Sequence, residues 1–247
     1  MDIKVKRKVE VIGLELPIFK GGEKVDLAEL IANYVEDGDI IVIAETLIAK
    51  LEGRILNKED IKPSKEAIEL AKKTGKDPKV VQAIIDEANE IIKVGKNFII
   101  TETKHGLVCA NSGVDESNSL GIKLLPKDPD KSAEMIRKRI EEITNKKVGV
   151  IISDSVGRPF RKGSVGIAIG VSGIIALWDR KGEKDLFGRE LKSTEVAIAD
   201  ELASMANVVM GEANEGIPIA IIRNAPVPFG DGRGRDLIRA KDEDVFR

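Results

Sequence analysis

The stretch ISDSVGRPFRKGSVG, residues 152–166, combines the residue types that a metal and phosphate site requires. It follows an apolar run at 148–152 and begins with Asp154 and Ser155. Three cations come within eight residues of that acid: Arg158, Arg161 and Lys162. Carboxylate and hydroxyl oxygens bind hard divalent cations, and guanidinium and ammonium groups hold phosphates. A polar surface loop could have the same composition, so the stretch alone leaves both interpretations open.

Two other segments place acidic or amide side chains after an apolar element. VCANSGVDESN puts Asp115 and Asn118 just after a predicted strand, and NVVMGEANEG puts Glu212 where a long predicted helix ends. The ends of strands and helices are where α/β folds build their sites. Each acid taken singly is equally typical of a cap or a turn. Their occurrence together with the cation-rich stretch favours a site for Mg²⁺ or Mn²⁺ and phosphate.

The common phosphate and zinc motifs are absent from the sequence. There is no Walker A loop and no Rossmann GxGxxG between a strand and a helix, and GDGRGR at 230–235 has the wrong spacing. One cysteine, Cys109, and one histidine, His105, cannot form a structural zinc site. His105 is explained by the polarity of a predicted turn. Lys50, which follows a predicted buried strand, is either a solvated lysine or a cation that reaches a phosphate.

The elements that must position these residues alternate along the chain. Helical spacing is expected at 26–38, 77–92, 128–143 and 193–212. Strands are expected at 3–12, 39–44, 97–103, 107–111, 148–153, 164–178 and 217–222. Interleaved strands and helices predict an α/β (mixed α+β) fold. A domain boundary is expected near 93–97 or near 179–189, and the polar, Gly-rich C-terminus is expected to be a mobile tail or a flap.

Composition excludes several classes of function. The 40 basic and 42 acidic residues balance, and aromatic residues make up 3% of the chain, so binding to nucleic acid is not expected. No apolar run approaches the roughly 20 residues of a membrane helix, and the single cysteine fits a reducing compartment. We therefore expect a cytoplasmic protein. The glycines of GSVGIAIGVSG predict either a tightly packed strand or a wall against a ligand or second subunit.

Several ordered motifs resemble those of the coenzyme F420-0:L-glutamate ligases, along nearly the whole chain. They are GLELPIF at 13–19, GDIIVIAETLIAKLEGR at 38–54, CANSGVDESN at 109–118, VGVIISDSVGRPFRKGSVGIAIGVSG at 148–173, GRELKSTEVAIADELASMANVVMGE at 188–212 and GIPIAIIR at 216–223. The resemblance implies that residues 1–247 form a single unit of two intertwined subdomains. It also implies a GTP-dependent ligase that joins L-glutamate to coenzyme F420-0 by a γ-type amide bond, giving F420-1 and then F420-2. It further implies an acyl phosphate intermediate, release of GDP and phosphate, two Mn²⁺ or Mg²⁺ ions, K⁺ as a further candidate ion, and a homodimer.

The resemblance also assigns roles to individual residues. The implied metal ligands are Asp115, Asp154, Ser155 and Glu212. The implied guanine nucleotide contacts are Leu16, Pro17, Ile18, Phe19, Glu45, Thr46, Lys50, Asn118, Val208, Val209, Met210, Gly211, Glu212, Ala213, Asn214 and Glu215. The residues expected to be catalytic are Lys50, Asp154 and Arg158; Arg158 is included for its charge and its nearness to Asp154 in the sequence, not for the resemblance. Relatives often have Ser in place of Glu45, which favours a main-chain contact there, and Thr in place of Ser155, which retains the hydroxyl.

Two other functions remain open at the level of sequence. One is a metal-dependent amide ligase or phosphotransferase that acts on a different acceptor. The other is a non-catalytic module that binds a nucleotide or forms oligomers without turnover.

Overall fold

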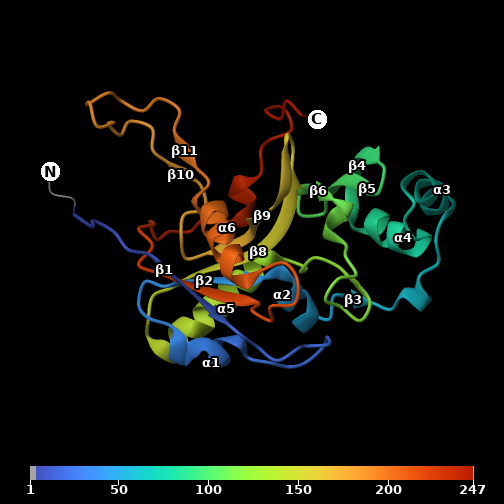
Figure 1. Cartoon of the computed structure of the whole chain (residues 1–247), viewed down its shortest axis with the longest axis horizontal. Coiled ribbons are helices and arrows are strands. Elements are labelled where there is room, and N and C mark those ends of the chain that lie inside the picture. Colours follow the sequence, from blue (N-terminus) through green and yellow to red (C-terminus); the bar gives the residue numbers. More distant parts are fainter. Residues whose placement is uncertain (1–3, 247) are drawn as a thin grey trace.

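A computed structural model describes residues 4–246 and shows a large part and a small part side by side (Figure 1). The large part contains a five-stranded sheet with the order β1-β12-β2-β8-β9. β2 and β8 run parallel, and the other neighbours run antiparallel. The strands are β1 (Glu10–Leu14), β12 (Ile219–Arg223), β2 (Ile40–Ala44), β8 (Gly149–Arg158) and β9 (Arg161–Ser172). The architecture is mixed α/β, as the interleaved pattern predicts.

The central strands bury both faces because successive side chains point to opposite sides of a sheet. Ile41 and Ile43 of β2 enter a core that includes residues of α1, α2 and α5, whereas Ile40 and Val42 enter a second core with α6. Apolar faces of these helices therefore cover the two sides of the sheet. Their bounds are α1 (Leu27–Ile31), α2 (Glu45–Leu51), α5 (Pro129–Thr144) and α6 (Ile198–Met210).

Local signals in the sequence set the bounds of α5, the longest helix. Asp128 caps its start by accepting a hydrogen bond from Lys131 N, and Pro129 occupies the first turn, where its missing N–H costs nothing. Asn145 ends the helix in the left-handed conformation, with φ 55°. The helix predicted at 128–143 is therefore confirmed almost residue for residue.

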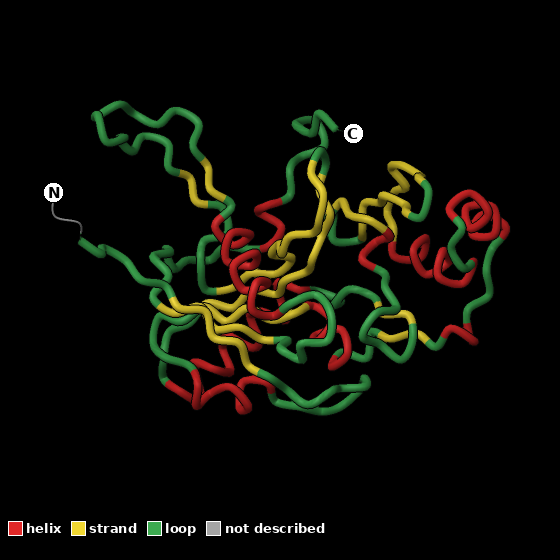
Figure 2. The backbone as a smooth tube through the Cα atoms, viewed as in Figure 1, coloured by secondary structure: helices red, strands yellow, loops and turns green. Residues whose placement is uncertain are grey.

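The small part has its own core, in which Val81 and Ile84 pack with Ile99. A three-stranded sheet, β4-β5-β6, lies beside two helices (Figure 2). The short pair β3–β7 lies at its junction with the large part. The elements are β3 (Ile55–Leu56), α3 (Lys65–Thr74), α4 (Pro78–Glu87), β4 (Ala88–Gly95), β5 (Phe98–Thr103), β6 (Val108–Ala110) and β7 (Ile122–Lys123). Short 3₁₀ turns occur at Ala32–Tyr34, Lys58–Asp60, Asn111–Gly113 and Gly234–Leu237.

A hairpin arm extends away from the large part, as Figure 1 shows for the β10–β11 pair. β10 (Trp178–Asp179) pairs with β11 (Glu195–Val196), and residues 179–189 belong to this arm. The arm exposes Leu186 and Phe187, whose relative exposures are 101% and 87%. Residues 93–97 lie at the other expected boundary, at the end of β4 and the turn into β5.

Several expected elements differ from the structure. The strand expected at 164–178 ends at Ser172, the helix expected at 193–212 begins at Ile198, and α3 was not expected. The helix expected at 77–92 ends at Glu87, because Ala88 turns to extended backbone and β4 pairs with β5. The strand expected at 3–12 is shifted and begins at Glu10. The strand expected to end at 153 continues to Arg158, and a tight turn with Phe160 at φ 64° returns the chain into β9.

Two glycines of β9, Gly166 and Gly170, are explained by helix packing rather than by a ligand or second subunit. A Cβ added to Gly166 would lie 2.6 Å from Ala203 O of α6, and one added to Gly170 would lie 2.4 Å from Pro129 O of α5. Real Cβ atoms do not approach backbone atoms so closely. The tight-packing alternative is therefore the correct one at these two positions.

The C-terminal segment is anchored as far as its 3₁₀ turn. Asp130 at the start of α5 accepts hydrogen bonds from Gly234 N at 2.6 Å and from Val171 N at 2.9 Å, so one carboxylate joins the segment to β9. The expectation of a mobile tail is wrong for this stretch. Within residues 4–246, no helix is long and apolar enough to cross a membrane.

Candidate functional site

A cavity of about 840 Å³ lies where β2 and β8 stop pairing. The parallel register ends at Ala44 opposite Ser153; β2 leads directly into α2, while β8 continues with β9 alone. The remaining walls come from residues 16–20, the 109–120 segment and the residues that follow α6. The cavity therefore lies between the large and small parts and draws on segments far apart in the sequence.

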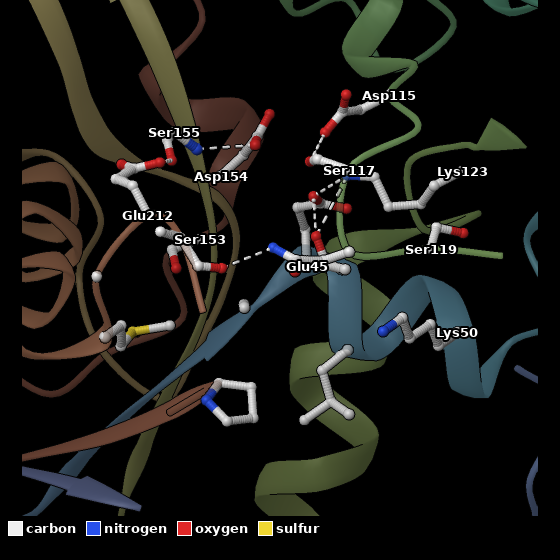
Figure 3. Close-up of a pocket in the computed structure, with 18 of the residues that line it drawn as sticks. Glu45, Lys50, Asp115, Ser117, Ser119, Lys123, Ser153, Asp154, Ser155 and Glu212 are labelled. Atoms are coloured by element: carbon white, nitrogen blue, oxygen red, sulfur yellow. Dashed lines mark hydrogen bonds and ion pairs between the residues drawn. The ribbon is translucent and has the colours of Figure 1, made fainter. Parts of the chain in front are cut away.

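Asp154 lies one residue beyond the end of the parallel pairing, on β8, and faces the cavity (Figure 3). It is not at the end of its strand, but it has the position expected from parallel strands, whose carboxyl ends build sites. Its Oδ1 accepts a hydrogen bond from Ser155 N at 2.8 Å. Burial, followed by the negative charge of Glu45, raises the pKa of Asp154 to about 7.

Glu45 and Lys123 form a buried ion pair in the wall facing Asp154, and both side chains are 4% exposed. Lys123 Nζ donates to Glu45 Oε1 and, at 3.3 Å, to Thr46 Oγ1. Burial alone would lower the pKa of Lys123, but the charges of Glu45, Asp154 and Asp115 raise it overall. Lys123 is therefore a fixed positive charge beside the carboxylates.

Ser155 and Glu212 meet at the end of the cavity nearest α6. Ser155 Oγ donates to Glu212 Oε2 at 2.8 Å, and Asn207 Nδ2 donates to Glu212 Oε1 at 2.7 Å. Glu212 follows Gly211, which ends α6 with φ 74°. The structure thus brings together two predicted metal ligands that are 57 residues apart in the chain.

Asp115 faces the cavity from the small part (Figure 3). Burial opposes its charge, but hydrogen bonds from the hydroxyl and backbone of Ser117 and from Glu116 N lower its pKa overall. Asp115 thus remains ionised while Asp154 has a raised pKa. The two acids hold their charge to different degrees because their surroundings differ.

Most of the predicted nucleotide contacts line this cavity, and a hydrogen bond joins two of the segments. Asn118 Nδ2 donates to Ala213 O at 3.1 Å. Val208 is 85% exposed, and it and Val209 lie outside the lining. The predicted contacts that do line the cavity are Leu16, Pro17, Ile18, Phe19, Glu45, Thr46, Lys50, Asn118, Met210, Gly211, Glu212, Ala213, Asn214 and Glu215.

Lys50 lies on α2 and lines the cavity with a side chain that is largely buried. Burial lowers the pKa of Lys50; the charge of Glu23 partly offsets this, and that of Lys123 adds to it. A lysine that is buried beside an open cavity is suited to an anionic group. The solvated-lysine alternative is therefore wrong.

Arg158 lies at the tip of the β8–β9 hairpin, outside the cavity lining. Its Nη1 donates to Gly163 O at 3.2 Å. Arg161 and Lys162 begin the return strand and are exposed. Within this chain the hairpin therefore separates the three cations from Asp154 and Ser155, because the strand continues where a loop was expected.

Sequence reasoning missed Lys123. The signal was a single lysine between Ile122 and Leu124. A charged residue inside an apolar run is expected to be buried, and therefore to need a charged partner. Cys109 also lines the cavity, but burial and the charge of Asp154 raise its pKa to about 12. Because the thiolate is the reactive form, Cys109 is not a nucleophile here.

The donors around the cavity suit a hard divalent cation. Carboxylate and hydroxyl oxygens are supplied by Asp115, Asp154, Ser155 and Glu212, and one buried carboxylate oxygen, Glu45 Oε2, has no hydrogen-bond partner. In residues 4–246, no three His, Cys, Asp or Glu side chains already converge in an arrangement that could hold an ion. The donor set fits such an ion, and side-chain rotation must bring the oxygens together.

Comparisons with known proteins agree over most of the chain. A family model described as F420-0:Gamma-glutamyl ligase matches residues 13–224. A protein of Methanocaldococcus jannaschii named coenzyme F420:L-glutamate ligase is 81% identical, over 99% of both chains. Proteins of the same name from Methanothermobacter thermautotrophicus and Archaeoglobus fulgidus are 51% and 47% identical, over 97% of this chain and 99% and 97% of theirs. The chain therefore belongs to the F420-0:gamma-glutamyl ligase family.

Proposed function

We propose that this protein joins L-glutamate to coenzyme F420-0 through a γ-type amide bond, with cleavage of GTP to GDP and phosphate. The observation that carries the proposal is that an ionised acid, an acid with a raised pKa and a buried lysine line the same cavity. The matching family and the names of the relatives support the choice of acceptor and amino acid.

The chemistry needs an activated carboxylate, because an oxide ion cannot leave when an amine attacks. A carboxylate oxygen of F420-0 attacks the γ-phosphorus of GTP, the bond from that phosphorus to the β–γ bridging oxygen breaks, and GDP leaves. The neutral amine of L-glutamate then attacks the acyl carbon, inorganic phosphate leaves with the former carboxylate oxygen, and the nitrogen loses a proton. A second round on the product would give the diglutamyl form.

Asp115, Asp154, Ser155 and Glu212 would hold the Mn²⁺ or Mg²⁺ ions, whose bound charge would neutralise the phosphate oxygens during transfer. The protein's own contribution is to position the reacting groups and to provide fixed charges in a partly buried site, where those charges act strongly. Glu212 is held by Ser155 and Asn207, so it reaches the site already oriented. K⁺ is a further candidate ion for the same cavity.

Lys50 is expected to bind the nucleotide phosphates. Lys50→Met should raise KM for GTP about 10–100-fold, the effect of losing one charge-assisted hydrogen bond, with a smaller effect on KM for L-glutamate. Steady-state kinetics with each substrate varied measures both constants. Lys24→Met is the matched control, since Lys24 is exposed and lies outside the cavity lining. An unchanged KM for GTP in the Lys50 variant would remove Lys50 from the phosphate site.

Phosphate release tests the proposed reaction. With Mn²⁺, GTP and F420-0 present, the protein is expected to release phosphate from GTP only when L-glutamate is added. A coupled phosphate assay records the rate, with L-aspartate and D-glutamate as control amino acids. Folded, metal-supplied protein that releases no phosphate would contradict the proposal, and release with another acceptor would favour the alternative ligase.

We further propose a homodimer. The hairpin arm exposes two neighbouring large apolar side chains, Leu186 and Phe187, almost completely. An adjacent exposed apolar pair of this kind is typical of a surface that contacts another protein chain. Light scattering coupled to gel filtration measures the mass, and Leu186→Lys together with Phe187→Lys should shift it toward the monomer. A monomeric wild-type protein would overturn this assignment.

A further inference from the structure

Glu45 presents a buried carboxylate oxygen that nothing in the described chain satisfies. Its side chain is 4% exposed. Oε1 accepts hydrogen bonds from Lys123 Nζ and, at 2.8 Å, from Thr46 Oγ1, whereas Oε2 has no partner among residues 4–246. A buried charged oxygen without a partner is costly, so its retention calls for a ligand that supplies the missing positive charge.

Glu45, which carries the unpartnered oxygen, belongs to the lining of the carboxylate-lined cavity. Asp154 lines the same cavity, and Figure 3 shows the two carboxyl groups on neighbouring walls. Both carboxyl groups offer oxygens of the kind that hard divalent cations bind, so one cation in this cavity can draw on both residues.

Lys123 supplies one positive charge beside three carboxyl groups, those of Glu45, Asp154 and Asp115. Its ammonium group contacts Glu45 through Oε1 and also Thr46, so it holds the carboxylate in one orientation. Because the carboxylate is fixed in this way, Glu45 cannot turn Oε2 toward Lys123 without breaking the hydrogen bond between Lys123 Nζ and Oε1. The second oxygen is thereby kept available for another partner.

We propose that Glu45 is a metal ligand through Oε2, sharing a divalent cation with Asp154, and that Lys123 is the residue that positions it. The proposal rests on the proposed metal dependence and adds a side-chain role where family resemblance supports only a main-chain contact to the nucleotide. Oxygen from two carboxylates suits Mn²⁺, which serves as the probe.

Direct titration with Mn²⁺, followed by electron paramagnetic resonance of the free ion and without nucleotide, tests the proposal. Glu45→Gln removes one charge and should raise the Kd for Mn²⁺ about tenfold or more. Glu116→Gln removes the same charge from a side chain outside the cavity lining, 3.0 Å from Lys58 Nζ, and should change Kd less than twofold. Equal Kd values for Glu45→Gln and wild type would overturn the proposal.

A second variant covers the case in which Glu45→Gln fails to fold. Glu45→Asp keeps the negative charge beside Lys123 but withdraws the carboxylate by one methylene, so it should fold and still bind Mn²⁺ at least about threefold more weakly. Wild-type affinity in a folded Glu45→Asp protein would also overturn the proposal.

The same titration separates this proposal from the proposed reaction. Wild-type protein that binds Mn²⁺ tightly, loses that affinity on Glu45→Gln and forms no glutamyl product would support the ligand while contradicting the reaction. Wild-type protein that forms product while Glu45→Gln binds Mn²⁺ normally would contradict the ligand alone.

Discussion

Asp154→Asn is expected to lower kcat about 10³-fold while making the metal-free protein more stable at pH 8. The activity falls because the amide removes a charged ligand from the proposed metal site. The stability rises because the native protein no longer holds a carboxylate charge in a poorly hydrated position. Steady-state ligase assays measure the first effect, and urea unfolding in the presence of a chelator measures the second.

The pH dependence gives this prediction its sign. The pKa of Asp154 is raised to about 7 in the folded protein, above its value of 3.8 in an unfolded chain. Folding therefore favours the protonated acid. The stabilising contribution of Asp154 to the free energy of unfolding is fully present below pH 4 and is lost as pH rises to about 7. The variant should match wild type near pH 4 and exceed its free energy of unfolding by about 2 kcal/mol at pH 8, with allowance for solvent at the cavity surface.

Asp200→Asn is the matched control. Asp200 is also a partly buried acid with a raised pKa, but it lies outside the cavity lining. That variant should shift stability in the same direction but retain ligase activity. An Asp154→Asn protein that is less stable than wild type at pH 8, or that turns over normally, would contradict the account of this residue.

Lys123→Met is expected to destabilise the metal-free protein by about 3–5 kcal/mol. The substitution leaves Glu45 buried with no ammonium partner, and removing one member of a buried pair costs far more than removing both. Urea unfolding monitored by circular dichroism measures the loss. Ligase activity should fall in parallel, because Glu45 loses the contact that orients it.

The double variant Glu45→Gln with Lys123→Met tests the reason for that loss. A neutral pair should recover most of the stability, so that the coupling energy between the two positions is about 2 kcal/mol or more. Lys104→Met is the control, since this exposed lysine lies 3.8 Å from Glu87 and should cost less than about 1 kcal/mol. Additive losses at positions 45 and 123 would show that the pair is not the cause.

Periodicity predicted the elements better than it predicted their ends. The run at 148–152 gave a buried strand correctly, but strand pairing continues to Arg158 because β9 supplies hydrogen bonds to a polar partner. The helix expected to reach residue 92 ends at Glu87 for the same reason, because the residues that follow pair with β5. Long-range pairing overrides local pattern in both cases.

The site was predicted in part. The sequence shows three polar residues just after apolar runs, namely Asp154, Ser155 and Asp115, and their side chains suggest metal binding. The structure brings all three to one cavity. The contribution of Lys123 is not visible, because its partner Glu45 is 78 residues away. The separation of Arg158 from the cavity depends equally on tertiary structure, here the direction of a hairpin.

Mass spectrometry of F420-0 incubated with the protein, GTP, Mn²⁺ and L-glutamate tests the central claim most directly. The account predicts that the acceptor gains the mass of one glutamyl residue, and then of a second, only when GTP is present. Fragmentation should place the new amide on the γ-carboxylate of the preceding glutamate in the second product. An acceptor of unchanged mass, with folded protein and Mn²⁺ bound, would contradict the account.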